Sequence, residues 1–177
     1  MWIEKLNADV VPWLLESQPW TRYRTLVELL DKPEDDPDVL AAKQAMLKNE
    51  QMQKLITDTQ NWFPQSVTRH NDAKLTHYKL RLLADFGLQA DDPGMAAVIE
   101  QSVAHQQNGL PAIRQTLPKK GEGFGKPDPD ANEWHAMPCD SPLLAMTLKD
   151  LGYTAPELET AVQTMTEQWS TPQGWFC

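Results

Sequence analysis

The sequence has few of the features that mark secreted, membrane-spanning or disulfide-stabilised proteins. Its 177 residues include only two cysteines, Cys139 and Cys177, too few for a disulfide framework, and this favours a reducing cytoplasm. A single disulfide between these two residues stays open as an alternative. No apolar run approaches the ~20 residues that cross a bilayer. The start of the chain, residues 1–5, lacks the basic and apolar blocks of a signal peptide.

Basic residues are also scarce. Lys and Arg number 16 against 25 Asp and Glu, which gives a formal net charge of −9. The densest basic stretch, residues 69–81, is interrupted by Asp72. Because such a chain repels a phosphate backbone, we do not expect it to bind nucleic acid.

No segment alternates apolar and polar residues in the way of a half-buried strand, so we expect no β-strand. Helical spacing recurs instead. We expect Asp92 and Thr154 to cap helices, with Pro93 and Pro156 in the first turns. Further helices are predicted at about 10–16, 19–30, 37–48, 49–62, 75–86 and 141–151.

The apolar positions of these helices predict the core. One stripe runs through Leu75, Tyr78, Leu82 and Phe86. Hydrophobic residues make up 41% of the chain, enough to build a core. The side chains expected to be buried are Leu82, Phe86, Val98, Leu144, Leu148, Leu158, Val162 and Met165, with Trp13, Trp20, Trp62 and Trp169 packed between helices.

Glycine and proline cluster between residues 108 and 139 and interrupt every periodic pattern there. A loop of this length without an element is unusual in a compact domain and is often functional. We therefore expect a long loop over 108–139, ending just before a helix.

The helices repeat in pairs. Gly87 and Gly152 each follow a leucine-rich helix, and Gly109 and Gly174 each follow a second helix. Both pairs of glycines are separated by the same interval of 65 residues. Helix pairs at such a period predict an αα-repeat, in which neighbouring pairs cover each other's apolar faces.

The repeated unit, with Asp-Asp-Pro between its helices and Gln173-Gly174-Trp175 after the second, resembles that of the terpenoid cyclases and protein prenyltransferase β-subunits. The stretch 13–30 resembles uncharacterised bacterial proteins of this superfamily. The resemblance implies an all-α fold, an α/α-toroid-like array of antiparallel hairpins. About three hairpins fit residues 1–177, a single repeat domain that is a partial toroid, the N-terminal part of a longer one or one half of a dimer.

The catalytic signatures of these relatives are not matched. The cyclases protonate their substrate with Asp-x-Asp-Asp, whereas here only Asp128 and Asp130 come near that motif. The β-subunits hold zinc with an Asp two residues before a Cys, whereas here Asp140 directly follows Cys139. The resemblance therefore implies neither activity, and no metal or cofactor is specified.

Cys139 and Asp140 start a helix that the resemblance places in an inner ring. A helix N-terminus favours anions, so a cavity nucleophile or metal ligand is one interpretation. The other is that Asp140 or Ser141 caps the helix while Cys139 packs. His70 and Asp72 form a second candidate acid–base or metal pair, or else they are hydrogen-bonded loop residues. His77 lies with them before the same apolar helix, either as a third member of this group or facing solvent.

Trp134, His135 and Trp175 are the candidate ligand contacts. An aromatic ring at the mouth of a cavity can stack on an apolar ligand. The alternative for Trp134 is an anchor that holds the long loop to the core.

Two functions follow. The first is a binding domain that holds an apolar small molecule or peptide on a concave face. The second is an enzyme acting on an isoprenoid-like substrate through Cys139, Asp140, His70 and Asp72. Because a fold does not determine a function, their convergence on one aromatic-lined site decides between the two. An uncovered apolar face on the last helix also predicts self-association through the C-terminal hairpin.

Overall fold

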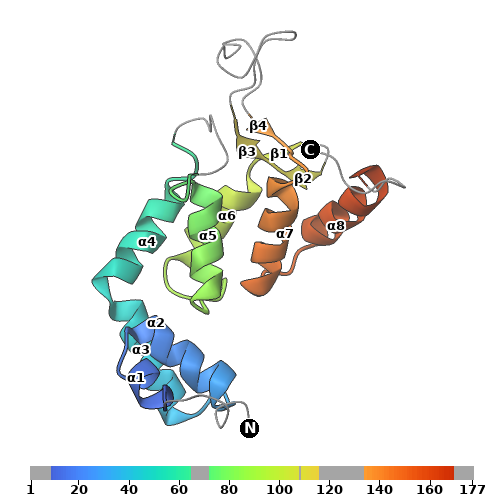
Figure 1. The fold of residues 1–177 in the computed structure, drawn as a ribbon. Coiled ribbons are helices and arrows are strands. Elements are labelled where there is room, and N and C mark those ends of the chain that lie inside the picture. The colour runs from blue at the N-terminus through green and yellow to red at the C-terminus, as the bar shows by residue number, and fades with distance from the viewer. Residues whose placement is uncertain (1–8, 65–71, 108, 116–133, 170–177) are drawn as a thin grey trace. The chain divides into compact units, whose positions relative to one another are not determined.

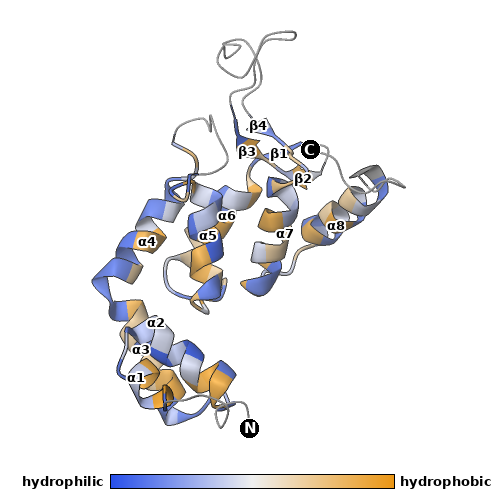
Figure 2. Ribbon diagram, in the orientation of Figure 1, coloured by the Kyte–Doolittle hydropathy of each residue, from blue (hydrophilic) through white to orange (hydrophobic). Residues whose placement is uncertain are grey.

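A computed structural model describes residues 9–64, 72–107, 109–115 and 134–169. It divides the chain into two compact units, Met1–Leu55 and Ile56–Cys177, which are described one at a time. The sequence pattern does not predict this division. Within the described residues the structure is mainly helical, and each helix carries both apolar and hydrophilic residues (Figures 1 and 2). No described helix has the length and apolar character that a bilayer crossing requires.

The first unit contains α1 (Val11–Leu15), α2 (Pro19–Arg24), a π-helical turn η2 (Thr25–Leu29), α3 (Pro37–Lys48) and the first half of α4 (Glu50–Gln60). Its core is made by Tyr23, Leu26, Val39, Ala42 and Met46. The predicted helices over 19–30 and 37–48 are confirmed. Trp13 was expected in the core but is 69% exposed, since α1 is a single short turn with no buried residue.

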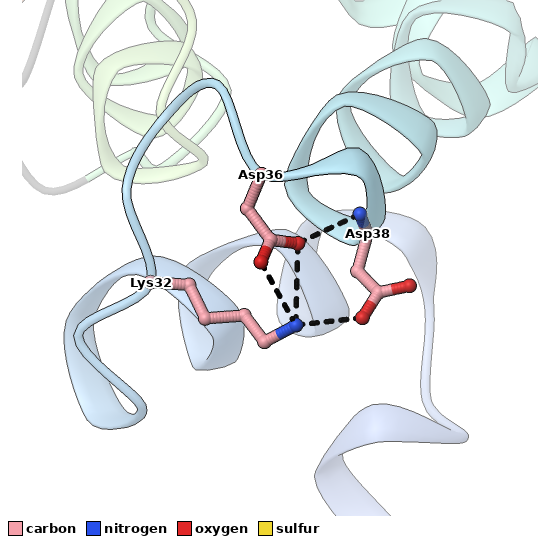
Figure 3. Close-up of polar contacts among 3 residues, drawn as sticks. All are labelled: Lys32, Asp36 and Asp38. Carbon is pink, nitrogen blue, oxygen red and sulfur yellow. Dashed lines mark hydrogen bonds and ion pairs between the residues drawn. The ribbon is translucent and has the colours of Figure 1, made fainter.

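The N-terminus of α3 shows why the acidic run before it leads into a helix. The Asp36 carboxylate accepts a hydrogen bond from the Asp38 amide at 2.8 Å and so caps the helix. Lys32 reaches back to both aspartates, at 3.2 Å from Asp36 and 2.6 Å from Asp38 (Figure 3). The Asp38 amide, followed by Lys32, lowers the pKa of Asp36.

The second unit is built from α5 (Thr76–Asp85), α6 (Met95–Val103), α7 (Asp140–Asp150) and α8 (Pro156–Trp169). It also has four two-residue strands, which the sequence pattern did not predict. They form two antiparallel ladders, β1 (Gln106–Gln107) with β2 (Leu110–Pro111) and β3 (Ile113–Arg114) with β4 (Trp134–His135). Strands of two residues are too short to show alternation. A long loop was expected over 108–139, but some of its described residues form these ladders.

Two helix starts differ from the prediction. Asp92 does not cap α6: its carboxylate accepts from the Gln89 amide at 2.7 Å, and Gly94 precedes the helix instead. Neither Asp140 nor Ser141 is the N-cap of α7, because that position belongs to Cys139. The Ser141 hydroxyl instead accepts from the Met137 amide and donates to the Pro111 carbonyl. These contacts tie the start of α7 to β2.

The ends of α5 and α7 share one hydrogen-bonding pattern. The Leu88 amide donates to the Leu83 carbonyl at 3.1 Å, and the Tyr153 amide donates to the Leu148 carbonyl at 3.0 Å. Each bond encloses a glycine with positive φ. The φ angle is 87° at Gly87 in the first ending and 75° at Gly152 in the second. This is a Schellman ending, which favours glycine because a Cβ is strained in that conformation. Equivalent residues of the two endings lie 65 positions apart.

The core of the second unit lies between α5, α6, α7 and α8. Val98, Leu144, Leu148 and Met165 are buried as predicted. Leu82 and Val162 were expected there, but they are 40% and 49% exposed. On α5 the buried face instead carries Thr76, His77, Leu80, Leu83 and Ala84. The predicted stripe was displaced because a polar residue, His77, occupies the buried face.

Candidate functional site

The candidate site lies where α5 and α7 begin. The two helices lie side by side, and the β-ladders stand at the same end of the unit (Figure 1). The first turn of α5 carries His77 and Tyr78, and the start of α7 carries Cys139 and Asp140. Two helix N-termini therefore bring titratable side chains together.

His77 and Asp140 form the buried centre of the site. The His77 Nε2 atom lies 3.3 Å from Asp140 Oδ1, and the two residues are 0% and 2% exposed. The distance is that of an ion pair, but the ring N–H is not aimed at the oxygen. Neither ring nitrogen of His77 has a hydrogen-bond partner among the described residues. Asp140 is the first residue of α7, where the helix dipole also stabilises a negative charge.

The other carboxylate oxygen of Asp140 is engaged by a neighbour. The Cys139 thiol donates to Asp140 Oδ2 at 3.4 Å. The cysteine side chain is exposed while the aspartate is buried. Neither ring nitrogen of His77 accepts a hydrogen bond from this thiol.

Aromatic rings surround the buried pair. Phe63 stacks on His77 with centroids 5.6 Å apart, and the Tyr78 ring lies 4.1 Å from the imidazole. Trp134 meets Phe63 edge-on at 6.1 Å and stacks on His105 at 3.5 Å with an interplanar angle of 7°. Such contacts add to the stability given by burial of the rings. Tyr78, Trp134 and His105 are half-buried, so part of the aromatic surface is accessible.

Phe63 is held in a backbone conformation that a bulky residue rarely adopts. Its φ is 45°, which costs on the order of 1–3 kcal/mol unless the surroundings stabilise it. Its amide donates to the Thr76 hydroxyl at 3.2 Å. The Arg114 guanidinium donates to the Phe63 carbonyl at 3.4 Å and to the Pro64 carbonyl at 3.3 Å. The strained residue is thus fixed from both sides against His77.

Burial changes the titration of two residues at the site. The pKa of Tyr78 is raised above 10.0, first by desolvation and then by the negative charges of Asp140 and Cys139. The pKa of His105 is lowered below 6.5 by desolvation. Both shifts favour the neutral side chain, so the aromatic surface is uncharged at neutral pH.

The structure brings together only some of the residues expected from the sequence. Cys139, Asp140 and Trp134 belong to this site. The Asp72 carboxylate accepts from the Lys74 amide at 2.9 Å in the turn before α5, which is the alternative role of a hydrogen-bonded loop residue. His135 pairs through its backbone with Ile113, and its buried Nε2 has no partner among the described residues. His70 and Trp175 lie outside the described residues.

Phe63 and Tyr78 were not among the expected site residues, and His77 was considered only beside His70 and Asp72. The alternative that His77 faces solvent is wrong, because the imidazole is completely buried against Asp140. The available signal was the position of His77 three residues before Leu80, on what proves to be the buried face of α5. The role of Phe63 could not be predicted from the sequence, since it depends on contacts between distant parts of the chain.

No three His, Cys, Asp or Glu side chains in the described ranges are arranged to hold a metal ion. In the comparisons with known proteins, no family model, no curated protein and no solved structure matches this chain.

Proposed function

We propose that this chain is a helical-repeat domain of the α/α-toroid type that binds an apolar small molecule or peptide at the start of α5 and α7, without a reaction of its own. The observation that carries this proposal is the half-buried aromatic surface of Tyr78 and Trp134 around the His77–Asp140 pair. Aromatic faces with a few fixed polar groups are typical of ligand sites.

The polar chemistry of the site favours binding over catalysis. Both oxygens of Asp140 already have neighbours, His77 on one side and the Cys139 thiol on the other. His77 is not placed as a base for this thiol, since neither of its ring nitrogens has a hydrogen bond. The pair therefore serves to join α5 to α7 and to position the rings. A toroid-like array is supported by the matching ends of α5 and α7 and by their side-by-side packing.

Calorimetric titration with farnesol, an uncharged isoprenoid alcohol, tests the binding proposal. We expect saturable binding that weakens at least about tenfold in Trp134→Ala, because an aromatic contact is lost. Trp13→Ala is the matched control, since Trp13 is exposed and belongs to the first unit. Equal affinity in both variants would overturn the site, and native mass spectrometry of the purified protein would reveal a co-purified apolar molecule.

The second candidate is an enzyme acting on an isoprenoid-like substrate. One observation favours it: Asp140 is a buried carboxyl group beside aromatic rings, where a protonated acid could act on an apolar substrate. Incubation with farnesyl diphosphate, followed by mass spectrometry of the products, separates the two. Product formation that disappears in Asp140→Asn would replace the binding proposal by this one.

A further inference from the structure

The far end of α7 carries a second surface, separate from the candidate site at its start. An open groove of about 400 Å³ lies between the last turn of α7 and the first turns of α8. Its apolar lining includes Tyr153, Leu158 and Val162, and its charged lining residues are Lys149 and Glu159. On α8, positions 158 and 162 are one turn apart, and so are 159 and 163, so they share one side of the helix.

Two large apolar side chains of this hairpin are exposed. Val162 is 49% exposed and Met146, on α7 three residues before Lys149, is 51% exposed. Inside the hairpin, by contrast, Ala145, Ala161 and Met165 form a closed cluster with Leu110. The hairpin is therefore well packed inside, although Met146 and Val162 are exposed. They lie outside that cluster, where exposed apolar side chains are available for a contact with another molecule.

The charges at the groove identify the partner. Lys149 and Glu159 are both exposed, and neither has an ion-pair partner within the described residues. They carry opposite signs and line one apolar groove. A two-fold axis beside Val162 would place Lys149 of each copy beside Glu159 of the other while the apolar side chains at the edge of the groove meet. Such self-complementarity is what an isologous dimer contact requires.

We infer that the groove between α7 and α8 is the contact surface between two copies of this chain. Val162 and Leu158 of both copies would meet near the axis, and two Lys149–Glu159 pairs would flank them. This inference does not depend on the proposed ligand site, which lies at the opposite end of α7.

Sedimentation equilibrium of the full chain over a range of micromolar concentrations tests the inference. The wild type is expected to show a reversible monomer–dimer equilibrium. Lys149→Glu and Glu159→Lys should each weaken dimerisation about tenfold, since two attractive pairs become repulsive. Val162→Lys should abolish it. Leu82→Lys, which replaces a similarly exposed residue on α5, is the matched control and should leave the equilibrium unchanged.

Mixing the two charge variants gives the sharpest outcome. In a mixed dimer of Lys149→Glu with Glu159→Lys, both cross-axis pairs again join opposite charges, so dimerisation should return to the wild-type level. Circular dichroism of each variant checks that its helix content is unchanged. A wild type that stays monomeric, or a mixture that associates no better than the single variants, would overturn the inference. Native mass spectra that show only monomers carrying a bound small molecule would also overturn it.

Discussion

The imidazole of His77, on α5, lies 3.3 Å from the carboxylate of Asp140, on α7, and both side chains are buried. This relationship determines which face of α5 points inwards. With His77 inside, the helical period also buries Leu80, Leu83 and Ala84 and leaves Leu82 outside. One polar contact thus explains both the site and the corrected core.

The first prediction concerns this pair. His77→Leu should lower the free energy of unfolding by about 3–5 kcal/mol, because it removes the imidazole beside a buried carboxyl group. The double variant His77→Leu/Asp140→Leu should be more stable than His77→Leu alone by about 1 kcal/mol or more, since the buried carboxyl group is removed as well. Urea unfolding measures both values. Costs that simply add would show that the two side chains do not interact.

The second prediction tests the face of α5 with two adjacent leucines. Leu83→Ala should cost about 2–5 kcal/mol, because Leu83 is fully buried and its loss leaves a cavity. Leu82→Ala should cost less than about 1 kcal/mol, because its side chain is 40% exposed. The midpoints of urea unfolding provide the comparison. Equal losses of stability in the two variants, or a larger loss for Leu82→Ala, would contradict the burial of the Leu83 face of α5.

The third prediction concerns the phenol of Tyr78. Its pKa should lie above 10.0 because of desolvation, with the nearby negative charges adding to the shift. Asp140→Asn should lower that pKa only in part, since desolvation remains. Ultraviolet titration of the protein, minus that of Tyr78→Phe, isolates this residue. Because the folded pKa is raised, its contribution to stability is present below pH 10 and is lost as the pH rises through the folded pKa. An unchanged pKa in Asp140→Asn would contradict the proximity of the carboxylate.

The fourth prediction concerns the stack of His105 on Trp134. Proton NMR should show that His105 titrates below 6.5, because burial disfavours the charged ring. Trp134→Ala should raise the pKa towards 6.5 by exposing the imidazole to water. Since the folded pKa is lowered, the contribution of this residue to stability is present above pH 6.5 and is lost as the pH falls through the folded pKa. The same His105 pKa in the wild type and in Trp134→Ala would contradict the stacking of His105 on Trp134.

Several features of the fold could be predicted from neighbouring residues alone. The cap at Asp36 and the glycine endings of α5 and α7 depend on bonds within a few residues of each other. Such local chemistry is the same in any tertiary context, and the glycine endings of α5 and α7 are confirmed. Asp92 shows the limit of this reasoning, because its carboxylate had a second local partner, the Gln89 amide.

The candidate site was predicted in part, for the same physical reason. Cys139 and Asp140 could be selected because they begin a helix, a property readable from Pro142 and the leucines that follow. The pairing of Asp140 with His77 could not be read in this way. It depends on α5 and α7 packing side by side, and the sequence pattern of each helix is compatible with more than one buried face.

The sequence by itself determined the helical class, most helix ranges and the 65-residue correspondence between the ends of α5 and α7, because these follow from short-range periodicity, capping and glycine conformation. Only the tertiary structure decided that His77 is buried, that Phe63 stacks on it and that Trp13 and Val162 face solvent. Burial of a side chain is set by what packs against it from distant parts of the chain, and a periodic pattern does not specify that neighbour.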